Sequence, residues 1–117
     1  MIYKYNFRFN AIHNTSLDLD INKKHTHTFE ILCYVEQSKS NYDLVESQIN
    51  NYLTKFRGSY LNDIMIKLPT IENIAELFYK DINEIAKDFT LIRLELSDKP
   101  IQTYIIGKEI GVKDDSI

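Results

Sequence analysis

The sequence predicts an α+β domain in which a four-stranded antiparallel sheet carries two helices on one face. Two segments at each end of the chain have the pattern of strands, and two amphipathic helical segments lie between them. Hairpins and helices are thus segregated along the chain, in the order strand, strand, helix, helix, strand, strand, which is typical of such a sheet. We expect one domain over residues 1–107 and a short C-terminal tail over residues 108–117.

The first expected strand ends at His13, and its alternate residues are aromatic or apolar on one side and polar on the other. This period of two is typical of a half-buried strand, whose apolar side we expect to meet the helices. Polar residues 14–24 predict a loop, after which a second strand runs from His25 to Glu36. Cys33 lies among the apolar residues of that strand, and we interpret it as a buried side chain rather than a ligand or nucleophile.

Two helices are expected in the middle of the chain. Apolar residues recur at helical spacing over residues 45–56, and Gly58 is a suitable C-terminal cap. A second apolar stripe covers residues 71–85. Thr70 precedes it as a suitable N-cap, and Glu72 suits the positive first turn of a helix.

The last two strands are expected over residues 90–97 and 101–106, joined by a turn at residues 98–100. A four-stranded sheet in a small domain has two edges with unpaired backbone groups. We therefore expect several copies of the chain to assemble through edge pairing.

The composition of the chain indicates which kinds of partner and which cellular location to expect. The net charge is −3 and there is no basic block, so nucleic acid is not an expected partner. No apolar run approaches the roughly 18 residues that span a bilayer, so we expect no membrane contact. Polar residues interrupt the first nine positions, which is unlike a signal peptide, and a single cysteine fits a reducing compartment. These features favour a cytoplasmic location.

The three histidines are the strongest chemical feature of the sequence. His25 and His27 are two residues apart on one expected strand, and His13 ends the other arm of the expected hairpin. Their rings can therefore meet at the mouth of the hairpin, where three imidazoles could hold zinc and leave a fourth position for water or substrate. The alternative is that they are ordinary histidines in a sheet, because a His-x-His pair alone is a weak signal.

Four motifs resemble those of the 6-pyruvoyl-tetrahydropterin synthase and 6-carboxytetrahydropterin synthase family. Residues 9–13 read Phe-Asn-Ala-Ile-His, and residues 25–27 read His-Thr-His, where the family has His-Gly-His. Residues 60–63 read Tyr-Leu-Asn-Asp, and residues 69–73 read Pro-Thr-Ile-Glu-Asn, which opens a helix in the family. The resemblance keeps this order from about Phe7 to Tyr104.

The resemblance implies the tunnelling fold, with zinc held by His13, His25 and His27. It implies a homo-oligomer, usually a hexamer with sites between subunits, that acts on a pterin-type substrate such as dihydroneopterin triphosphate. The reaction class would be a zinc-dependent carbon–oxygen lyase of pterin or deazapurine (queuosine) biosynthesis. The same resemblance puts Thr70 and Glu72 near the substrate pocket, although we favour helix capping as their role.

The chain also departs from the family at the positions that carry its chemistry. A nucleophile-like cysteine of the family falls on Ile21, and the family's catalytic Asp-His pair falls on Arg57 and Gly58. A pterin-anchoring Glu falls on Leu96. None of these side chains is a general base near neutral pH, and Leu96 cannot accept a hydrogen bond from a pterin. The resemblance therefore implies that the metal ligands are retained while the proton carriers and the substrate anchor are lost.

Three explanations follow from these departures. The protein is a diverged enzyme with replacement carboxylates, a non-catalytic subunit that binds a metal or a heterocycle, or a structural domain with vestigial histidines. Candidate replacements for substrate binding or proton transfer are Asp98 and Glu95, although Glu95 should face away from Leu94 and Leu96, and Asp18 or Asp20 could move protons. The alternative for each is an ordinary solvated surface carboxylate. Arg57 either pairs with an anionic ligand or interacts with the dipole at the end of its helix.

Overall fold

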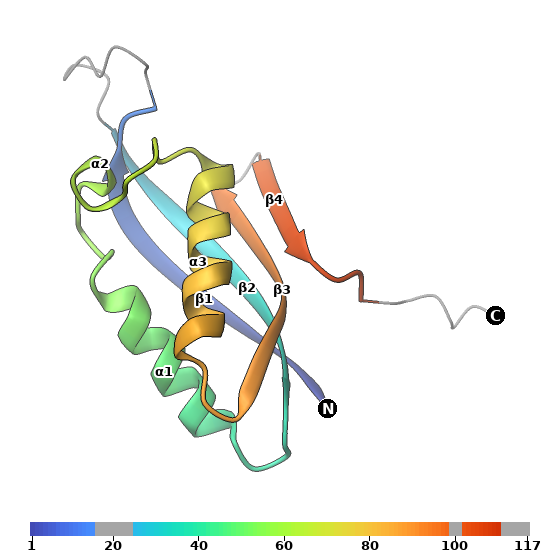
Figure 1. The fold of residues 1–117 in the computed structure, drawn as a ribbon. Coiled ribbons are helices and arrows are strands. Elements are labelled where there is room, and N and C mark those ends of the chain that lie inside the picture. The colour runs from blue at the N-terminus through green and yellow to red at the C-terminus, as the bar shows by residue number, and fades with distance from the viewer. Residues whose placement is uncertain (16–24, 99–101, 111–117) are drawn as a thin grey trace.

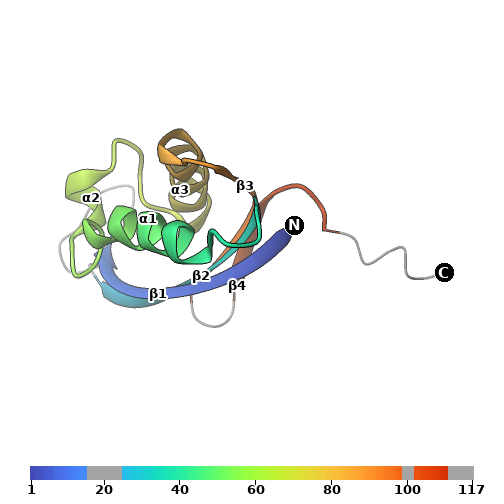
Figure 2. The same ribbon diagram turned by 90° about the horizontal axis from the view of Figure 1, so that it is seen from below.

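The computed structural model describes residues 1–15, 25–98 and 102–110, and it has the expected α+β architecture (Figure 1). Its elements are, in chain order, β1 (Ile2–His13), β2 (His25–Gln37), α1 (Tyr42–Thr54), α2 (Leu61–Ile64), α3 (Ile71–Ile85), β3 (Phe89–Asp98) and β4 (Gln102–Gly107). The strands form one antiparallel sheet in the order β1-β2-β3-β4. The helices lie together on one side of this curved sheet (Figure 2). None of the helices in the described part of the chain is long and apolar enough to cross a membrane.

The core lies between the helices and the apolar face of the sheet. On β1, Phe7, Phe9 and Ala11 are buried while the residues between them are more exposed, as the period of two predicts. The ring of Phe9 stacks on Phe29 of β2 with centroids 5.2 Å apart, and it meets Phe78 of α3 at 5.8 Å. The aromatic face of the first strand therefore packs against a helix, as expected, and Cys33 is fully buried in the same core.

Helix α3 begins at the predicted cap. The Thr70 hydroxyl accepts a hydrogen bond from the backbone N–H of Asn73 at 3.2 Å, which satisfies one of the donors that a helix start leaves unpaired. Its buried residues recur at spacings of three and four, which is the stripe that the sequence predicted; they are Ile71, Ile74, Ala75, Phe78 and Ile82.

The segment after α1 differs from expectation, because α1 ends at Thr54 and the chain then turns back to the sheet. Gly58 adopts φ +72°, a conformation that glycine reaches without a steric cost, so it ends a turn rather than the helix itself. Its N–H donates to Asn10 O at 2.7 Å, and Ile12 N–H donates to Ser59 O at 2.8 Å. This segment therefore covers the outer edge of β1 beside His13.

Strand β3 is longer at its end than the sequence predicted. Asp98, expected in a turn, is the last residue of the strand and pairs with Gln102 of β4. Earlier in β3 the register with β2 shifts, because Tyr34 pairs with Arg93 and Val35 pairs with Leu91. The residue between Leu91 and Arg93 is therefore unpaired and forms a β-bulge. As a result, every later residue of β3 points to the opposite face from the one it would otherwise have.

Candidate metal centre

The histidines are brought together by the register of the first hairpin. His13 and His25 lie at the loop ends of the β1–β2 hairpin, as the sequence predicted, and there they pair directly, while Ala11 pairs with His27. Side chains of directly opposed residues lie on the same face of an antiparallel sheet, so the small Ala11 is the neighbour of the His27 ring. The side chain of His25 lies outside what the structure describes, so its role as a ligand stays a prediction.

The rings of His13 and His27 lie against each other over an apolar floor. Their centroids are 4.7 Å apart and their planes meet at 77°. Beneath them is the fully buried Phe29, with ring centroids 5.3 Å from His13 and 6.2 Å from His27. His13 is only 4% exposed, so its imidazole is almost completely removed from bulk water.

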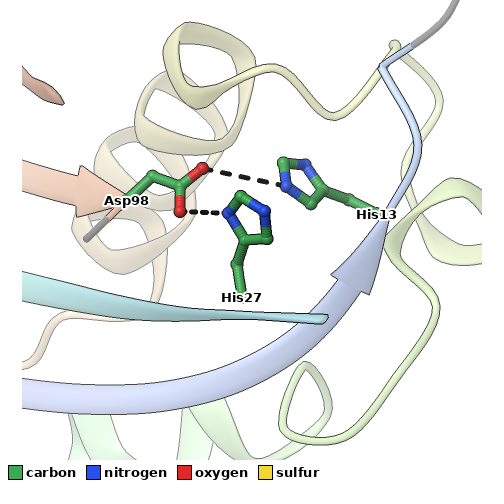
Figure 3. A group of neighbouring side chains, drawn as sticks. All are labelled: His13, His27 and Asp98. Carbon is green, nitrogen blue, oxygen red and sulfur yellow. Dashed lines mark hydrogen bonds and ion pairs between the residues drawn. The ribbon is translucent and has the colours of Figure 1, made fainter. Parts of the chain in front are cut away.

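A carboxylate from a third strand completes the group, as Figure 3 shows. Asp98 Oδ1 contacts Nδ1 of His27, and Asp98 Oδ2 lies 3.8 Å from Nε2 of His13. The three residues each offer one ligand atom, and these atoms lie within 4.8 Å of one another. Strands β1, β2 and β3 therefore each contribute one candidate metal ligand at the same end of the sheet.

The hydrogen bonds of the two rings fix which nitrogens face one another. His13 Nδ1 lies 3.0 Å from the carbonyl oxygen of Pro69. Because a carbonyl only accepts, Nδ1–H is the donor there, and Nε2 is the nitrogen suited to bind a metal. His27 directs Nδ1 at the Asp98 carboxylate, and its other ring nitrogen lies on the side toward His13 (Figure 3).

This arrangement fits a divalent metal ion. Histidines that bind metals almost always hold the other ring nitrogen on a carbonyl or a carboxylate, and both kinds of acceptor are present here. Imidazole nitrogen and carboxylate oxygen are both donors that zinc accepts. The residues present are therefore suited to zinc or a similar divalent ion.

Two asparagines fix the chain directly after His13. Asn62 of α2 accepts from the Asn14 backbone N–H through Oδ1 and donates through Nδ2 to the Asn14 carbonyl, both at 2.9 Å. The side-chain amide thereby satisfies the backbone of Asn14, which is fully buried. The sequence singled out Asn62 as part of a motif but did not predict this role.

The other two candidate substrate residues lie at the start of α3. Thr70 forms the helix cap described above, which confirms its structural role. Glu72 is exposed in the first turn and is not part of the His13, His27 and Asp98 group. The contact between this region and the histidines comes instead from the Pro69 carbonyl, which no sequence pattern could reveal, because every residue has a carbonyl. A substrate-binding role for Thr70 and Glu72 stays a prediction.

The residues to which the resemblance assigns the family's catalytic pair make structural contacts. The Arg57 side chain is exposed and donates to Asn50 Oδ1 of α1 at 3.1 Å, and Gly58 binds the edge of β1. Leu96, to which the resemblance assigns the pterin-anchoring Glu, is fully buried in the core.

The remaining candidate carboxylates do not join the site in the described part of the chain. Glu95 accepts hydrogen bonds from Tyr34 and Arg93, so its carboxylate is engaged on the other face of β3. Asp18, Asp20 and Ile21 lie outside the described residues.

Comparisons with known proteins agree with this fold. A family model described as 6-pyruvoyl tetrahydropterin synthase matches residues 2–109. The solved structure of the Caenorhabditis elegans 6-pyruvoyl tetrahydropterin synthase superimposes with a TM-score of 0.75 at 13% identity, covering 93% of this chain and 96% of that one. An uncharacterized protein from Wolinella succinogenes superimposes with a TM-score of 0.65 at 9% identity, covering 93% of this chain and 99% of that one. No curated protein matches the chain.

Proposed function

Because this chain belongs to the 6-pyruvoyl tetrahydropterin synthase family, we propose that it is a diverged, zinc-binding member that binds or acts on a pterin-type molecule such as dihydroneopterin triphosphate. The observation that carries the proposal is the convergence of His13 and His27 with Asp98 on one point. The proposed ligands are His13, His25 and His27. Backbone pairing of His25 with His13 supports the third ligand.

The protein groups around the site have separable roles in this proposal. When bound, the metal would polarise oxygens of a substrate. The Pro69 carbonyl holds the His13 ring through Nδ1, and the fully buried Phe29 excludes water from one side of both rings. Thr70 and Glu72 are proposed to line the substrate side of the site, with Asp98 as the nearest carboxylate.

Metal content tests the site directly. Protein purified without a histidine tag is expected to contain about one zinc per chain, and His13→Ala is expected to lose it, since zinc sites need at least three protein ligands. Gln37→Ala is the matched control, because Gln37 is a polar residue of similar burial, 5% against 4% exposed, at the other end of the same hairpin. Wild-type protein without metal would contradict the proposal.

Turnover separates an active enzyme from a binding protein. With dihydroneopterin triphosphate, the zinc-loaded protein is expected to bind the substrate but to convert it slowly, because a missing general base typically removes a factor of about 10² to 10⁴. Turnover comparable with that of family enzymes would show that other residues replace the missing proton carriers. Absence of any pterin binding would contradict the substrate class.

A second candidate function is a non-catalytic subunit that binds a metal or a heterocycle. The burial of Leu96 favours it, because a fully buried leucine offers neither a hydrogen bond nor space at the anchor position. The hydrogen bond from Arg57 to Asn50 also favours a non-catalytic subunit, because it ties the Arg57 side chain to a helix rather than to a substrate. Zinc binding with no measurable conversion of dihydroneopterin triphosphate would select this candidate.

The proposal also covers the oligomeric state and the cellular location of the protein. We expect a homo-oligomer, with the hexamer of the family as the first expectation, because β4 and the part of β1 that the segment after α1 leaves uncovered are edges of the sheet. Sedimentation of the purified protein would measure the number of subunits. We also expect a cytoplasmic location, for which fractionation of the source cells is the measurement.

A further inference from the structure

Asp98 lies on the helix-facing side of β3 because of the bulge earlier in that strand. Beyond the bulge, Leu94 and Leu96 are fully buried, and Asp98 follows them at the next position of the same face. The residue paired with it on β2 is Phe29, the floor beneath the histidines. Asp98 therefore lies on the same face of β3 as the core leucines, at the end of the strand where the histidines lie.

The Asp98 carboxylate is largely buried, and within residues 1–15, 25–98 and 102–110 its ion-pair partners are histidines. Its side chain is 15% exposed, and its ion-pair partners in the described chain are His13 and His27 rather than a lysine or arginine. Removing a carboxylate from water is unfavourable unless a positive charge compensates it. Metal-bound histidines are neutral, so the compensating charge in a loaded site comes from the ion itself.

The distances allow one ion to contact both the carboxylate and His13. Zinc binds imidazole nitrogen at about 2.0–2.1 Å and carboxylate oxygen at about 2.0–2.2 Å, so two ligand atoms at a tetrahedral angle on one ion are roughly 3.4 Å apart. Asp98 Oδ2 and His13 Nε2 are 3.8 Å apart, so a slightly wider angle at the ion or a small shift of either side chain lets both atoms bind it. The other oxygen, Oδ1, contacts His27 Nδ1.

We infer that Asp98 is itself a metal ligand, binding the ion through Oδ2 while Oδ1 orients His27. This inference rests on the proposed metal site and deepens it. The ion would then have mixed nitrogen and oxygen ligands with one negative charge, instead of imidazoles alone. Asp98 would take a position that a three-histidine site leaves to water or substrate. Carboxylate ligands also suit manganese better than imidazole does, so Asp98 favours binding of oxygen-preferring ions.

Three variants test this inference with the metal ions themselves as probes. Asp98→Asn keeps an oxygen that can accept from His27 but loses the charge, whereas Asp98→Ala loses both. Asp81→Asn is the matched control, because Asp81 is a similarly sheltered carboxylate, 22% exposed, that accepts a hydrogen bond from Tyr52 far from the histidines along the chain. Affinities for Zn²⁺ and Mn²⁺ are measured by competition with a chromophoric chelator, and the Co²⁺ form is examined by its visible absorption.

If Asp98 is a ligand, both Asp98 variants lose about 100-fold or more in Zn²⁺ affinity, because even residues that only orient ligands are worth about 10- to 100-fold. The loss is expected to be larger for Mn²⁺, the Co²⁺ spectrum changes, and Asp81→Asn leaves all three unchanged. Wild-type affinity and an unchanged Co²⁺ spectrum in Asp98→Asn would overturn the inference while leaving the histidine site intact. Wild-type protein that binds no metal would instead overturn the proposed function.

Discussion

Two regions of this molecule compare differently with the family pattern. At the histidine end of the first hairpin, His13, His27 and Asp98 lie on neighbouring strands, and their candidate ligand atoms lie within 4.8 Å of one another. At two positions to which the resemblance assigns a proton carrier and the pterin anchor, Arg57 binds helix α1 and Leu96 is buried in the core. The candidate metal ligands and the positions assigned to proton transfer therefore lie on different elements, so the two can be tested separately.

We expect the largest effect on stability when a glutamate replaces Leu96, the position to which the resemblance assigns the family's pterin-anchoring Glu. Leu96→Glu replaces a fully buried leucine with a carboxyl group that has no partner there, and we expect a loss of roughly 5 kcal/mol in the free energy of unfolding, or failure to fold. Chemical denaturation measures it. Leu96→Met is the control and should cost less than about 1.5 kcal/mol. A stable Leu96→Glu protein would mean that this position opens into a pocket, as in an active enzyme.

The thiol of Cys33, the only cysteine of the chain, is expected to react slowly in the folded protein. Complete burial raises the pKa of Cys33 from 9.0 to about 12, so the reactive thiolate is roughly a thousandfold scarcer than in an exposed cysteine at neutral pH. Iodoacetamide should therefore label the folded protein far more slowly than the protein in denaturant, as followed by mass spectrometry. Rapid labelling of the folded protein would contradict the burial of Cys33.

A smaller effect is expected when the space beside His27 is filled. Ala11→Val adds two methyl groups opposite the His27 ring and should cost about 1–3 kcal/mol of stability and on the order of tenfold in zinc affinity. Ala75→Val on α3 is the matched control, because Ala75 is equally buried but is not paired with a histidine. Equal zinc affinity in the two variants would show that Ala11 does not shape the site.

The smallest effect on stability is expected at Arg57, to which the resemblance assigns one residue of the family's catalytic pair. Arg57→Ala removes an exposed hydrogen bond to Asn50 and should change stability by less than about 0.5 kcal/mol, with zinc content unchanged. Lys55→Ala, an exposed cation from the same turn, is the control. If Arg57→Ala alone weakens binding of dihydroneopterin triphosphate more than tenfold, Arg57 pairs with an anionic ligand and belongs to the site.

Much of the fold follows from local patterns in the sequence. The alternation before His13 and the apolar stripe after Thr70 predicted a strand and a helix that the structure confirms. The sequence also placed His13 and His25 at the loop ends of one hairpin, while their direct pairing is a finding of the structure, since a long loop does not set the register. The four-residue helix α2 was not predicted, because one turn is too short to show a helical period.

By itself, then, the sequence determined the antiparallel sheet, the helical layer and the histidine end of the first hairpin, because their periodicity and motifs lie within short segments. Only the tertiary structure decided that Asp98 joins the histidines, since a single bulge in β3 sets the face to which it points. It likewise brought the Pro69 carbonyl to His13 and turned Gly58 onto the edge of β1. These contacts join segments distant in the chain through backbone groups and register, which residue types alone do not encode.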